Sequence, residues 1–510
     1  MNITKRRMFP ALLTILLFAT LLAGCAGKQS DAGQNDASQK EITCAADLEG
    51  ARIGVQLGTT GDIYVSDYEG DEAGTQIERY NKGADAIQAL KLGKIDCVVI
   101  DEQPGLQFVK QNSNIRIIDE EFTLEDYALC VAKENTELLD NINGALEKLK
   151  ADGTIDSIVK NYIGTDEEVG QYPYVSKEVE RNNGTLIIGT NAEFPPYEYY
   201  DNNQVTGIDI DIMRAISDEL GMDIQVEDMA FDSIIAAITS GKVNVGASGF
   251  TVTEERKKNI NFTDTYITTK QVIIVKGDND TQKAGIGEKF YDNFIKDSRY
   301  TYIVKGLGNT LLITLLAVTI GIILGFIIAI IRTGYDRNGE LPILNAICKV
   351  YLTVMRGTPV MIQLLIIYYV ILASATNKIM VAAIAFGLNS AAYVAEIVRS
   401  GIMSVDIGQF EAGRSLGLNY QQTMQSIILP QAIKNILPAL LNEVISLLKE
   451  TSISGYIGLM DLTKGGDIIR SNTYEAFLPL IAVAIIYLAL VMLLSFLAGK
   501  LERRLRNNER

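Results

Sequence analysis

An uncharged apolar segment, residues 311–331, constrains this chain more than any other feature. A helix of about 20 apolar residues is long enough to cross the hydrocarbon core of a bilayer. Four further candidate spans lie at residues 350–373, 379–398, 437–456 and 476–498. The C-terminal part of the chain, residues 301–510, is therefore predicted to be an all-α membrane domain with five spans.

The charge distribution separates a second, different part. The net charge of −16 is the sum of −22 over residues 1–298 and +6 over residues 299–510. An acidic half joined to an apolar, weakly basic half indicates a soluble part attached to a membrane part. The acidic half argues against nucleic acid as a partner, because phosphate binding needs clustered Lys and Arg.

The chain contains no histidine, which excludes Ser-His-Asp and Cys-His catalysis and every His-ligated metal site. Cysteines stand at positions 25, 44, 97, 130 and 348 and form no CxxC pair. A zinc ribbon and a thioredoxin-type motif are thereby excluded, and we expect no metal, no catalytic residues and no resident cofactor.

The N-terminal residues 1–25 have the pattern of a signal peptide. A basic start is followed by an apolar stretch at residues 8–22, too short for a spanning helix. The ending LAGC at residues 22–25 resembles a bacterial lipobox, which implies cleavage before Cys25 and lipidation of its sulfur. An ordinary signal anchor with a chance cysteine is the alternative. The polar residues 26–43 are expected to be a flexible tether.

Two α/β blocks follow, at residues 44–164 and 184–276, separated by a polar connector at 165–183. A second connector, 277–300, leads to the membrane domain. In the first block, strands are predicted at 51–56, 97–101 and 127–132 and helices at 136–150 and 155–163. In the second block, strands are predicted at 185–190, 245–249 and 270–275 and a helix at 208–220. Alternating strands and helices indicate an α/β fold.

Motifs in both blocks carry a family resemblance. The second block contains GTNAEFPPYEY (189–199), GIDID (207–211), FDSII (231–235) and GFTVTEER (249–256). Together with residues 48–61, 84–101 and 152–164, these motifs resemble the polar amino-acid binding proteins of ABC importers. The resemblance implies a two-lobe solute-binding domain of the periplasmic-binding-protein-like II type.

The order of the blocks differs from that of the family, in which lobe 1 precedes lobe 2. Here residues 44–164 match lobe 2 plus the closing helices, and residues 184–276 match lobe 1. A single circularly permuted domain is the simplest account, because permutation is tolerated where termini are exposed and close together. The alternative is two degenerate domains, each missing a half that another chain supplies.

The resemblance also implies the roles of site residues. Arg256 matches the arginine that holds the ligand carboxylate, for which a planar guanidinium is well suited. Thr251 and the backbone near Gly249 complete that cradle from lobe 1, and Thr59 and Thr60 add donors from lobe 2. Alone, Arg256 would more often be a solvated charge at a helix start.

Three further family positions concern the rest of the ligand. Asp101 matches the acceptor for the ammonium group, although a strand-end Asp can also cap the following helix. Phe194 and Phe231 match positions that sandwich the ligand side chain, although bare aromatics are more often core residues.

Specificity rests on four polar residues. Asn191 stands where several relatives have Asp, which weakens the case for a cationic ligand. Gln56 faces the pocket in the family pattern and suits a polar side chain. Glu193 and Asp209 leave a basic amino acid as an alternative ligand. A neutral polar amino acid is favoured.

The membrane half carries a second resemblance. Residues 411–413 (EAG), Gly417 and residues 428–430 (ILP, with Pro430) resemble the EAA loop of ABC importer permeases. The motifs RGTP (356–359), AEIVR (395–399) and LKETS (448–452) resemble the polar amino-acid subgroup of those permeases. The resemblance implies a type I, MetI-like permease that pairs as a homodimer and docks a separate cytoplasmic ATPase. In this motif Glu411, Ala412 and Gly413 would form a short docking helix, and an ordinary surface helix is the alternative.

Charges predict the orientation and the intramembrane pairs. Eleven Lys and Arg lie on the side of the C-terminal tail and five on the other, which predicts a cytoplasmic tail and an extracytoplasmic binding domain in a bacterial plasma membrane. Glu396 and Arg399 are spaced to form an ion pair on one helix face. Glu443 and Glu450 could line a polar path between subunits or form interface hydrogen bonds.

The favoured function is an ABC-type importer subunit that binds a polar amino acid and passes it to the fused permease. No GxxxxGK[ST] phosphate loop is present, so ATP hydrolysis is expected in a partner protein. An amino-acid sensor or channel is a second hypothesis, and the EAA resemblance argues against it. A lyase or dehydratase on the binding-protein fold is a third, which would need an acidic residue to act without histidine.

Overall fold

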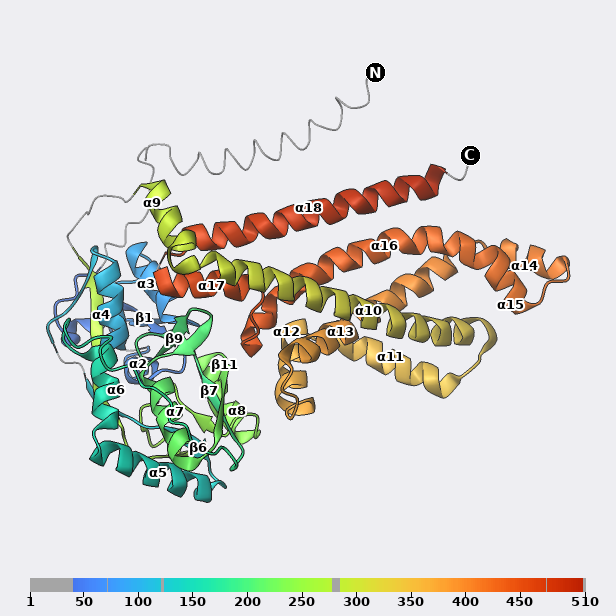
Figure 1. Cartoon of the computed structure of the whole chain (residues 1–510). Coiled ribbons are helices and arrows are strands. Elements are labelled where there is room, and N and C mark those ends of the chain that lie inside the picture. Colours follow the sequence, from blue (N-terminus) through green and yellow to red (C-terminus); the bar gives the residue numbers. More distant parts are fainter. Residues whose placement is uncertain (1–39, 71, 121–122, 278–284, 474, 508–510) are drawn as a thin grey trace, which may run out of the picture. The chain divides into compact units, whose positions relative to one another are not determined.

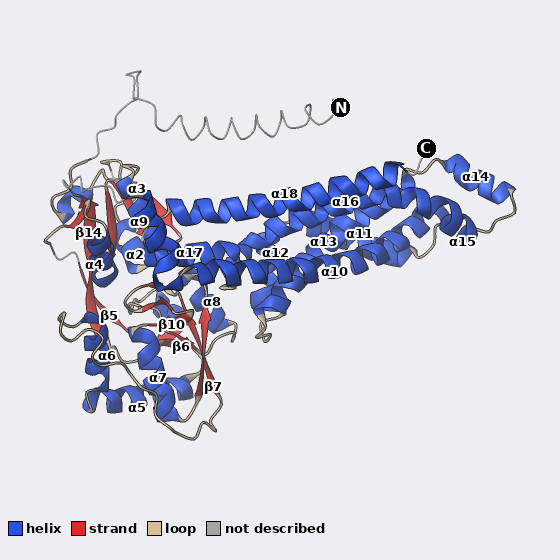
Figure 2. Ribbon diagram, turned by 45° about the horizontal axis from the view of Figure 1, so that its top comes forward, coloured by secondary structure: helices blue, strands red, loops and turns tan. Residues whose placement is uncertain are grey.

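A computed structural model describes residues 40–70, 72–120, 123–277, 285–473 and 475–507 (Figure 1). The signal-peptide and lipidation hypotheses, including Cys25, and most of the tether lie outside the described residues. Residues 41–510 form one compact unit, whose binding part contains two large sheets and a small one and whose C-terminal part is helical (Figure 2).

Lobe 2 is built on a sheet of the order β2-β1-β3-β14-β4, with β5 also paired to β14. Its strands are β1 Arg52–Gln56, β2 Gln76–Tyr80, β3 Cys97–Asp101, β4 Ile115–Ile117, β5 Thr123–Tyr127 and β14 Ile267–Lys276. The helices of this lobe are α2 Thr60–Ser66, α3 Gly83–Lys91 and α4 Glu102–Gln111. A short 3₁₀ turn at Ala45–Leu48 precedes β1 in the chain. Every residue of β3 is buried, as the run Val98–Ile100 at its centre predicts for a strand covered on both faces.

Lobe 1 has a sheet of the order β11-β7-β12-β6-β13. Its strands are β6 Cys130–Ala132, β7 Thr185–Thr190, β11 Asp223–Asp228, β12 Val245–Gly246 and β13 Ile260–Phe262. Its helices are α5 Thr136–Ala151, α6 Thr154–Ile163, α7 Ile208–Leu220 and α8 Ile234–Thr239. A small sheet of β8 Glu193–Phe194, β9 Glu198–Asp201 and β10 Gln204–Thr206 lies between β7 and α7 in the chain. The main core of the lobe joins α5, α6 and α7 to β7.

The chain crosses between the lobes twice, from β5 to β6 and from β13 to β14, and these crossings correct the sequence prediction. The expected strand at 127–132 is two strands, because β5 pairs with β14 in lobe 2 and β6 pairs with β13 in lobe 1. The block 184–276 was expected to be lobe 1 throughout, but its last strand, β14, lies beside β3 in the sheet of lobe 2. The main sheet of each lobe therefore contains strands from both sequence blocks.

The connector at residues 165–183 has no helix or strand but is fixed to α7. The hydroxyl of Tyr174 donates to Asp218 over 2.7 Å, and the backbone N–H of Lys177 donates to the same carboxylate over 2.7 Å. Arg181 also pairs with Asp218, whose side chain is fully buried. The connector thus links α6 to β7 along the surface of lobe 1.

The C-terminal part consists of helices. They are α9 Ile286–Phe290, α10 Tyr300–Asn338, α11 Pro342–Gly357, α12 Val360–Ile366, α13 Lys378–Met403, α14 Ile407–Ser415, α15 Tyr420–Thr423, α16 Leu429–Glu450, α17 Leu462–Thr473 and α18 Phe477–Asn507. Short 3₁₀ or π turns occupy Tyr291–Ile295, Lys296–Ser298, Ile367–Ile371, Met424–Ile428 and Thr451–Ile457. The connector 277–300 is therefore partly helical.

Three described helices, α10, α13 and α18, are long and apolar enough to span a membrane, and a bent pair makes a possible fourth. The pair Pro342–Gly357 and Val360–Ile371 bends by 110°, so the span expected at 350–373 is broken by this bend and stays a prediction. Pro359 ends α11, because helical backbone geometry is unfavourable for the residue before a proline, here Thr358. The span expected at 437–456 falls mostly on α16, which is not among these helices, and it stays a prediction.

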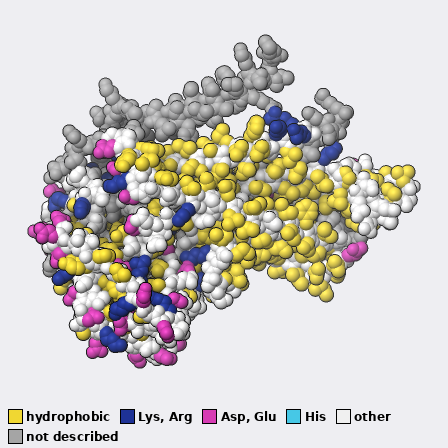
Figure 3. All heavy atoms as spheres, in the orientation of Figure 1, with side chains coloured by type: hydrophobic (Ala, Val, Ile, Leu, Met, Phe, Trp, Pro, Cys, Tyr) yellow, Lys and Arg dark blue, Asp and Glu magenta, His cyan; other side chains and the backbone are white. Residues whose placement is uncertain are grey.

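Small residues set the packing of α10 against α13. A Cβ at Gly325 would lie 2.6 Å from Val394, and one at Gly387 would lie 2.7 Å from Ile320. Close helix contacts through small residues are typical of membrane bundles. Figure 3 shows hydrophobic side chains gathered over the helical C-terminal part. Ile330 of α10 and Phe496 of α18 are among the exposed apolar residues of that part.

We expect Gly325→Leu to destabilise the membrane domain by about 1–3 kcal/mol, because the new side chain overlaps Val394. Gly308→Leu in the same helix is the control, since a Cβ there meets nothing within 4 Å. Thermal unfolding of the purified chain in detergent measures the difference. Equal melting temperatures for the two variants would contradict the packing argument.

Candidate ligand-binding site

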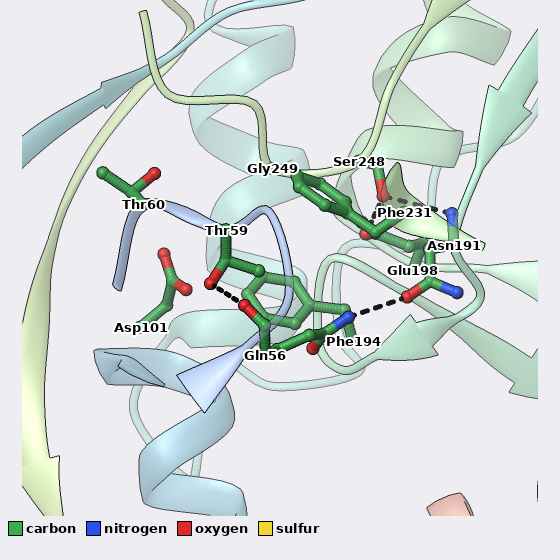
Figure 4. A pocket seen from close by; sticks show the side chains of 10 residues that line it. All are labelled: Gln56, Thr59, Thr60, Asp101, Asn191, Phe194, Glu198, Phe231, Ser248 and Gly249. Carbon is green, nitrogen blue, oxygen red and sulfur yellow. Dashed lines mark hydrogen bonds between the residues drawn. The ribbon is translucent and has the colours of Figure 1, made fainter. Parts of the chain in front are cut away.

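A small pocket lies where the two lobes meet (Figure 4). It is lined by residues of both lobes: Gln56, Thr59, Thr60, Asp101, Asn191, Phe194, Glu198, Phe231, Ser248 and Gly249. Its volume of about 10 Å³ is close to the space of one water molecule. The lobes are therefore closed on each other, and an amino acid can enter only after they move apart.

Lobe 2 contributes the turn after β1 and the end of β3. The Thr59 hydroxyl donates to the Gln56 carbonyl over 2.7 Å and shapes the turn, in which Gly58 has a φ of +75° that favours glycine. The Gln56 amide oxygen accepts from the backbone N–H of Gly83 over 3.2 Å. Asp101 ends β3 at the same edge and is buried.

Lobe 1 contributes residues after β7 and β12. The backbone N–H of Asn191 donates to the Ser248 hydroxyl over 3.1 Å, and that hydroxyl donates to Glu198 over 2.6 Å. The Asn191 amide nitrogen donates to the Met229 carbonyl over 3.0 Å, which leaves its oxygen facing Gln56.

Several hydrogen bonds hold the lobes together at the pocket. Gln56 donates to the Asn191 amide oxygen over 3.3 Å, as Figure 4 shows. The Thr60 and Thr251 hydroxyls are 2.7 Å apart, and the Arg256 guanidinium donates to the Gly58 carbonyl over 2.9 Å. When the lobes close around a polar ligand, the same groups are positioned to form hydrogen bonds with that ligand.

Arg256 and Thr251 lie behind the lining residues rather than among them. The Arg256 side chain donates to the Thr251 carbonyl over 2.9 Å and lies 5.5 Å from the ring centre of Phe231. Phe231 in turn stacks on Phe250 at 4.9 Å. The structure thus brings eight of the ten expected residues into the pocket wall and the other two into direct contact with that wall.

A group of buried carboxyls surrounds the pocket. Burial raises the pKa of Asp101, which accepts a hydrogen bond from the Tyr127 hydroxyl. Burial, together with the charge of Asp101, raises the pKa of Glu125 to about 8. Burial and the charge of Asp209 raise the pKa of Glu198 well above its ordinary value. A cation at this place would stabilise their ionised forms.

Two acidic residues have roles other than the expected ones. Asp209 accepts from the backbone N–H of Gly249 over 2.8 Å and from Tyr266 over 2.7 Å, so that N–H is not free for a ligand carboxylate as the sequence suggested. Glu193 pairs with Lys82 at 2.9 Å and with Lys464 at 2.8 Å. Burial alone would raise the pKa of Glu193. The charges of the two lysines outweigh this effect and lower the pKa to about 2.

Sequence reasoning did not single out Glu125, Tyr127, Glu198 or Ser248. Glu198 and Ser248 lie in or beside the motifs GTNAEFPPYEY and GFTVTEER, so their proximity to the site was visible. Glu125 and Tyr127 lie in β5, which carries no motif. Its pairing with β14 brings Glu125 to the Thr251 hydroxyl, 2.6 Å away.

The expected ATPase-docking loop forms a helical hairpin. Glu411, Ala412 and Gly413 lie in α14, and Gly417 has a φ of +82° in the turn that follows. A Cβ at Gly413 would lie 2.8 Å from Thr423, so the small residue serves packing within this chain. Pro430 is the second residue of α16, directly after the π turn Met424–Ile428.

The expected intramembrane pair is confirmed, and a second acid has a partner. Arg399 contacts Glu396 at 2.5 Å, and Arg332 and Asp336 extend the network. Glu443 accepts from the Ser390 hydroxyl over 2.8 Å.

Two lobes that close on a shared polar pocket define a solute-binding domain, joined here to a helical membrane domain. The chain belongs to the bacterial extracellular solute-binding proteins, family 3, whose model matches residues 186–458. The match begins in β7 and runs past β14, the last strand of the binding domain, into the membrane helices.

The chain is also similar to curated permeases. It is 41% identical over 219 residues to the "Putative glutamine transport system permease protein GlnP" of Rickettsia bellii, covering 42% of this chain and 98% of that protein. It is 39% identical to the arginine transport system permease protein ArtQ of Bacillus subtilis, covering 41% of this chain and 94% of that protein. A crystal structure of an amino acid ABC transporter with histidines is 43% identical, with a TM-score of 0.39, and covers 41% and 98% of the two chains.

We expect the ligand-free protein to lose stability as pH rises from about 4.5 to about 8. The folded state holds the Glu125 proton more tightly than the unfolded state, whose pKa is near 4.5, so deprotonation across this window favours unfolding. Glu125→Gln keeps the shape of the side chain but removes its titratable group. The melting temperature of this variant should therefore depend less on pH than that of the wild type. Glu134→Gln, at an exposed site, is the control. An unchanged slope in Glu125→Gln would contradict the assignment.

Proposed function

We propose that this chain is the substrate-binding and permease subunit of an ABC amino-acid importer. The binding domain captures a polar amino acid, closes over it and passes it to the fused permease. The observation that carries the proposal is a pocket walled by both lobes, with hydrogen-bonding groups from each, in a chain similar to glutamine and arginine permeases. As its relatives are transport permeases, we infer that the chain is not itself an enzyme.

We propose that the ligand is a neutral polar amino acid of the glutamine type. The amides of Gln56 and Asn191 and the hydroxyl of Ser248 suit an amide side chain. Glu193 is neutralised by two lysines, and Asp209 is occupied by Gly249 and Tyr266, so neither offers its charge to a cationic side chain. Asp101 would accept the ligand ammonium, and Arg256 and Thr251 would support its carboxylate.

Calorimetric titration of the purified full chain with the twenty amino acids tests the ligand. We expect saturable binding of glutamine and weaker binding of arginine. Asn191→Asp should shift the ratio of the two affinities toward arginine by at least tenfold, about 1.4 kcal/mol, because it adds a negative charge in the pocket. Ser240→Asp, on the exposed end of α8, is a control that adds the same charge elsewhere. Tighter binding of arginine than glutamine by the wild type would refute this specificity.

We also propose that the binding domain is circularly permuted within one chain. Three observations support this: the main sheets of both lobes use strands of both blocks, the connector 165–183 joins α6 to β7, and the family match begins in β7 rather than near β1. In this proposal, residues 44–164 and 184–276 complete one domain without another chain.

The partners follow from the membrane half. We propose a cytoplasmic ATPase that docks at α14 and α15, a homodimer formed through the permease helices, and contact with membrane lipid. Two observations on the hairpin support docking. Ile407 and Leu416 are 69% and 79% exposed. Ile407 also lines a cavity of about 600 Å³ together with Phe410, Glu411 and Arg414. The protein is proposed to lie in the bacterial plasma membrane with its binding domain outside and its C-terminus in the cytoplasm.

We expect Leu416→Asp to abolish amino-acid-stimulated ATP hydrolysis when the chain is reconstituted with its ATPase, while leaving amino-acid affinity unchanged. The charge would have to be buried at the docking surface, which is costly. Val175→Asp is the control, because Val175 is 77% exposed in the connector of the binding domain. Full ATPase stimulation in Leu416→Asp would place the docking surface elsewhere.

A further inference from the structure

A row of hydrogen-bonded side chains runs from the pocket to a buried acid in β5. Thr60 lines the pocket, and its hydroxyl donates to the Thr251 hydroxyl over 2.7 Å. The Thr251 hydroxyl donates in turn to Oε2 of Glu125 over 2.6 Å. The three residues, here called the hydroxyl row, are 4%, 4% and 3% exposed. Bulk water therefore has little access to these hydrogen bonds.

The backbone fixes one link of the row and leaves the other to the closure of the lobes. A β-bridge joins Thr251 of lobe 1 to Tyr127, which stands two residues after Glu125 in β5. Thr60 begins α2 of lobe 2, so its bond to Thr251 crosses from one lobe to the other. The row is therefore complete only when the lobes are closed.

The titratable groups that face Glu125 come from three elements. Asp101, at the end of β3, raises the pKa of Glu125, and Tyr127 of β5 donates its hydroxyl to Asp101. Arg256, which follows β12 in the chain, favours the ionised form of Glu125. Burial and the charge of Asp101 outweigh Arg256 and raise the pKa of Glu125 to about 8, so this acid carries a proton at neutral pH.

The described strand β14, next to β5, turns uncharged side chains toward this place. Thr269 lies opposite Glu125 in the strand register, and Gln271 shares its face because alternate residues of a strand point the same way. Both are buried. Lys270, between them, pairs with Glu102 at 3.2 Å. β14 therefore offers no cation that would balance an ionised Glu125.

The protonation of Glu125 decides the direction of the hydroxyl row. A carboxylate can only accept hydrogen bonds, so an ionised Glu125 draws both hydroxyl hydrogens toward itself, and Thr60 presents only oxygen lone pairs to the pocket. A protonated Glu125 can donate to Thr251, which can then donate to Thr60. The hydrogen of the Thr60 hydroxyl is then free to point into the pocket, where a ligand carboxylate can accept it.

We propose that protonated Glu125 is a positioning residue for the ligand carboxylate, acting through the hydroxyl row. This inference rests on the proposed function, in which Asp101 pairs with the ligand ammonium and Arg256 supports its carboxylate. The ammonium by itself would favour an ionised Glu125, but Asp101 already balances that charge. Where the ligand-free protein has lost the proton, binding takes one up from water and forms the O–H bond of Glu125.

Calorimetric titration of the full-length chain in detergent between pH 6 and pH 9 tests the inference. L-glutamine is the probe, and L-arginine replaces it if glutamine does not bind. Glu125→Gln should keep the wild-type Kd at pH 6, because its amide N–H donates to Thr251 at every pH. The ratio of the wild-type Kd to that of Glu125→Gln should rise about tenfold from pH 7 to pH 9, since the ligand-free wild type loses its proton near pH 8. The titration of the probe itself cancels in this ratio.

Glu134→Gln is the matched control, because it removes a carboxyl at an exposed site, and its Kd should follow that of the wild type at every pH. A second measurement needs no variant. Titration of the wild type in two buffers of different ionisation enthalpy counts the protons taken up with the probe. We expect about half a proton per bound amino acid at pH 8 and none at pH 6.

Three outcomes would overturn the inference. One is a Kd of Glu125→Gln that rises with pH as steeply as that of the wild type. Another is binding to the wild type without proton uptake at pH 8. The third is weaker binding by Glu125→Gln at pH 6 with an unchanged melting temperature, because an uncharged donor at this position would then not suffice. A wild-type chain that binds neither amino acid would instead overturn the proposed function on which the inference rests.

Discussion

The binding domain depends on the antiparallel ladders that β5 and β6 form with β14 and β13. Backbone N–H and C=O groups in a buried sheet must be paired, and neither sequence block can pair its central strands alone. β12 needs both β6 and β7, and β14 needs β3, β4 and β5. The two blocks are therefore parts of one cooperative domain, and the crossing strands are the connection about which its lobes can move.

The same strand pairing creates the electrostatics of the pocket. β5 brings Glu125 beside Thr251 and places Tyr127 against Asp101, so several carboxyls are buried within a few side chains of one another. Burial raises the pKa of Asp101 and Glu125 and so favours their protonated forms, whereas a ligand ammonium group beside them would favour the ionised forms. Arg256 balances this charge while holding the backbone of both lobes.

Glu193 illustrates how distant elements decide specificity. In the sequence, Glu193 belongs to the ligand-binding motif and leaves a basic amino acid as an alternative ligand. In the fold it is buried between Lys82 of lobe 2 and Lys464 of the permease, and its charge is already balanced. An acid that selects a cationic ligand in one context thus connects the binding domain to the permease in this one.

The sequence by itself determined the elements with strong periodicity and the motif residues of the pocket. The strands at 97–101 and 185–190 and the helix at 208–220 have the predicted bounds, and the pair Glu396–Arg399 forms as its spacing requires. These features depend on local hydrogen bonding and side-chain spacing, which a linear pattern records. Only the tertiary structure decided the strand exchange between lobes, the 110° bend at Pro359, the use of the Gly249 N–H by Asp209 and the ion pair of Glu193 with Lys464. Each of these depends on which distant groups meet in a buried place, and burial and pairing are properties of the folded chain rather than of any one segment.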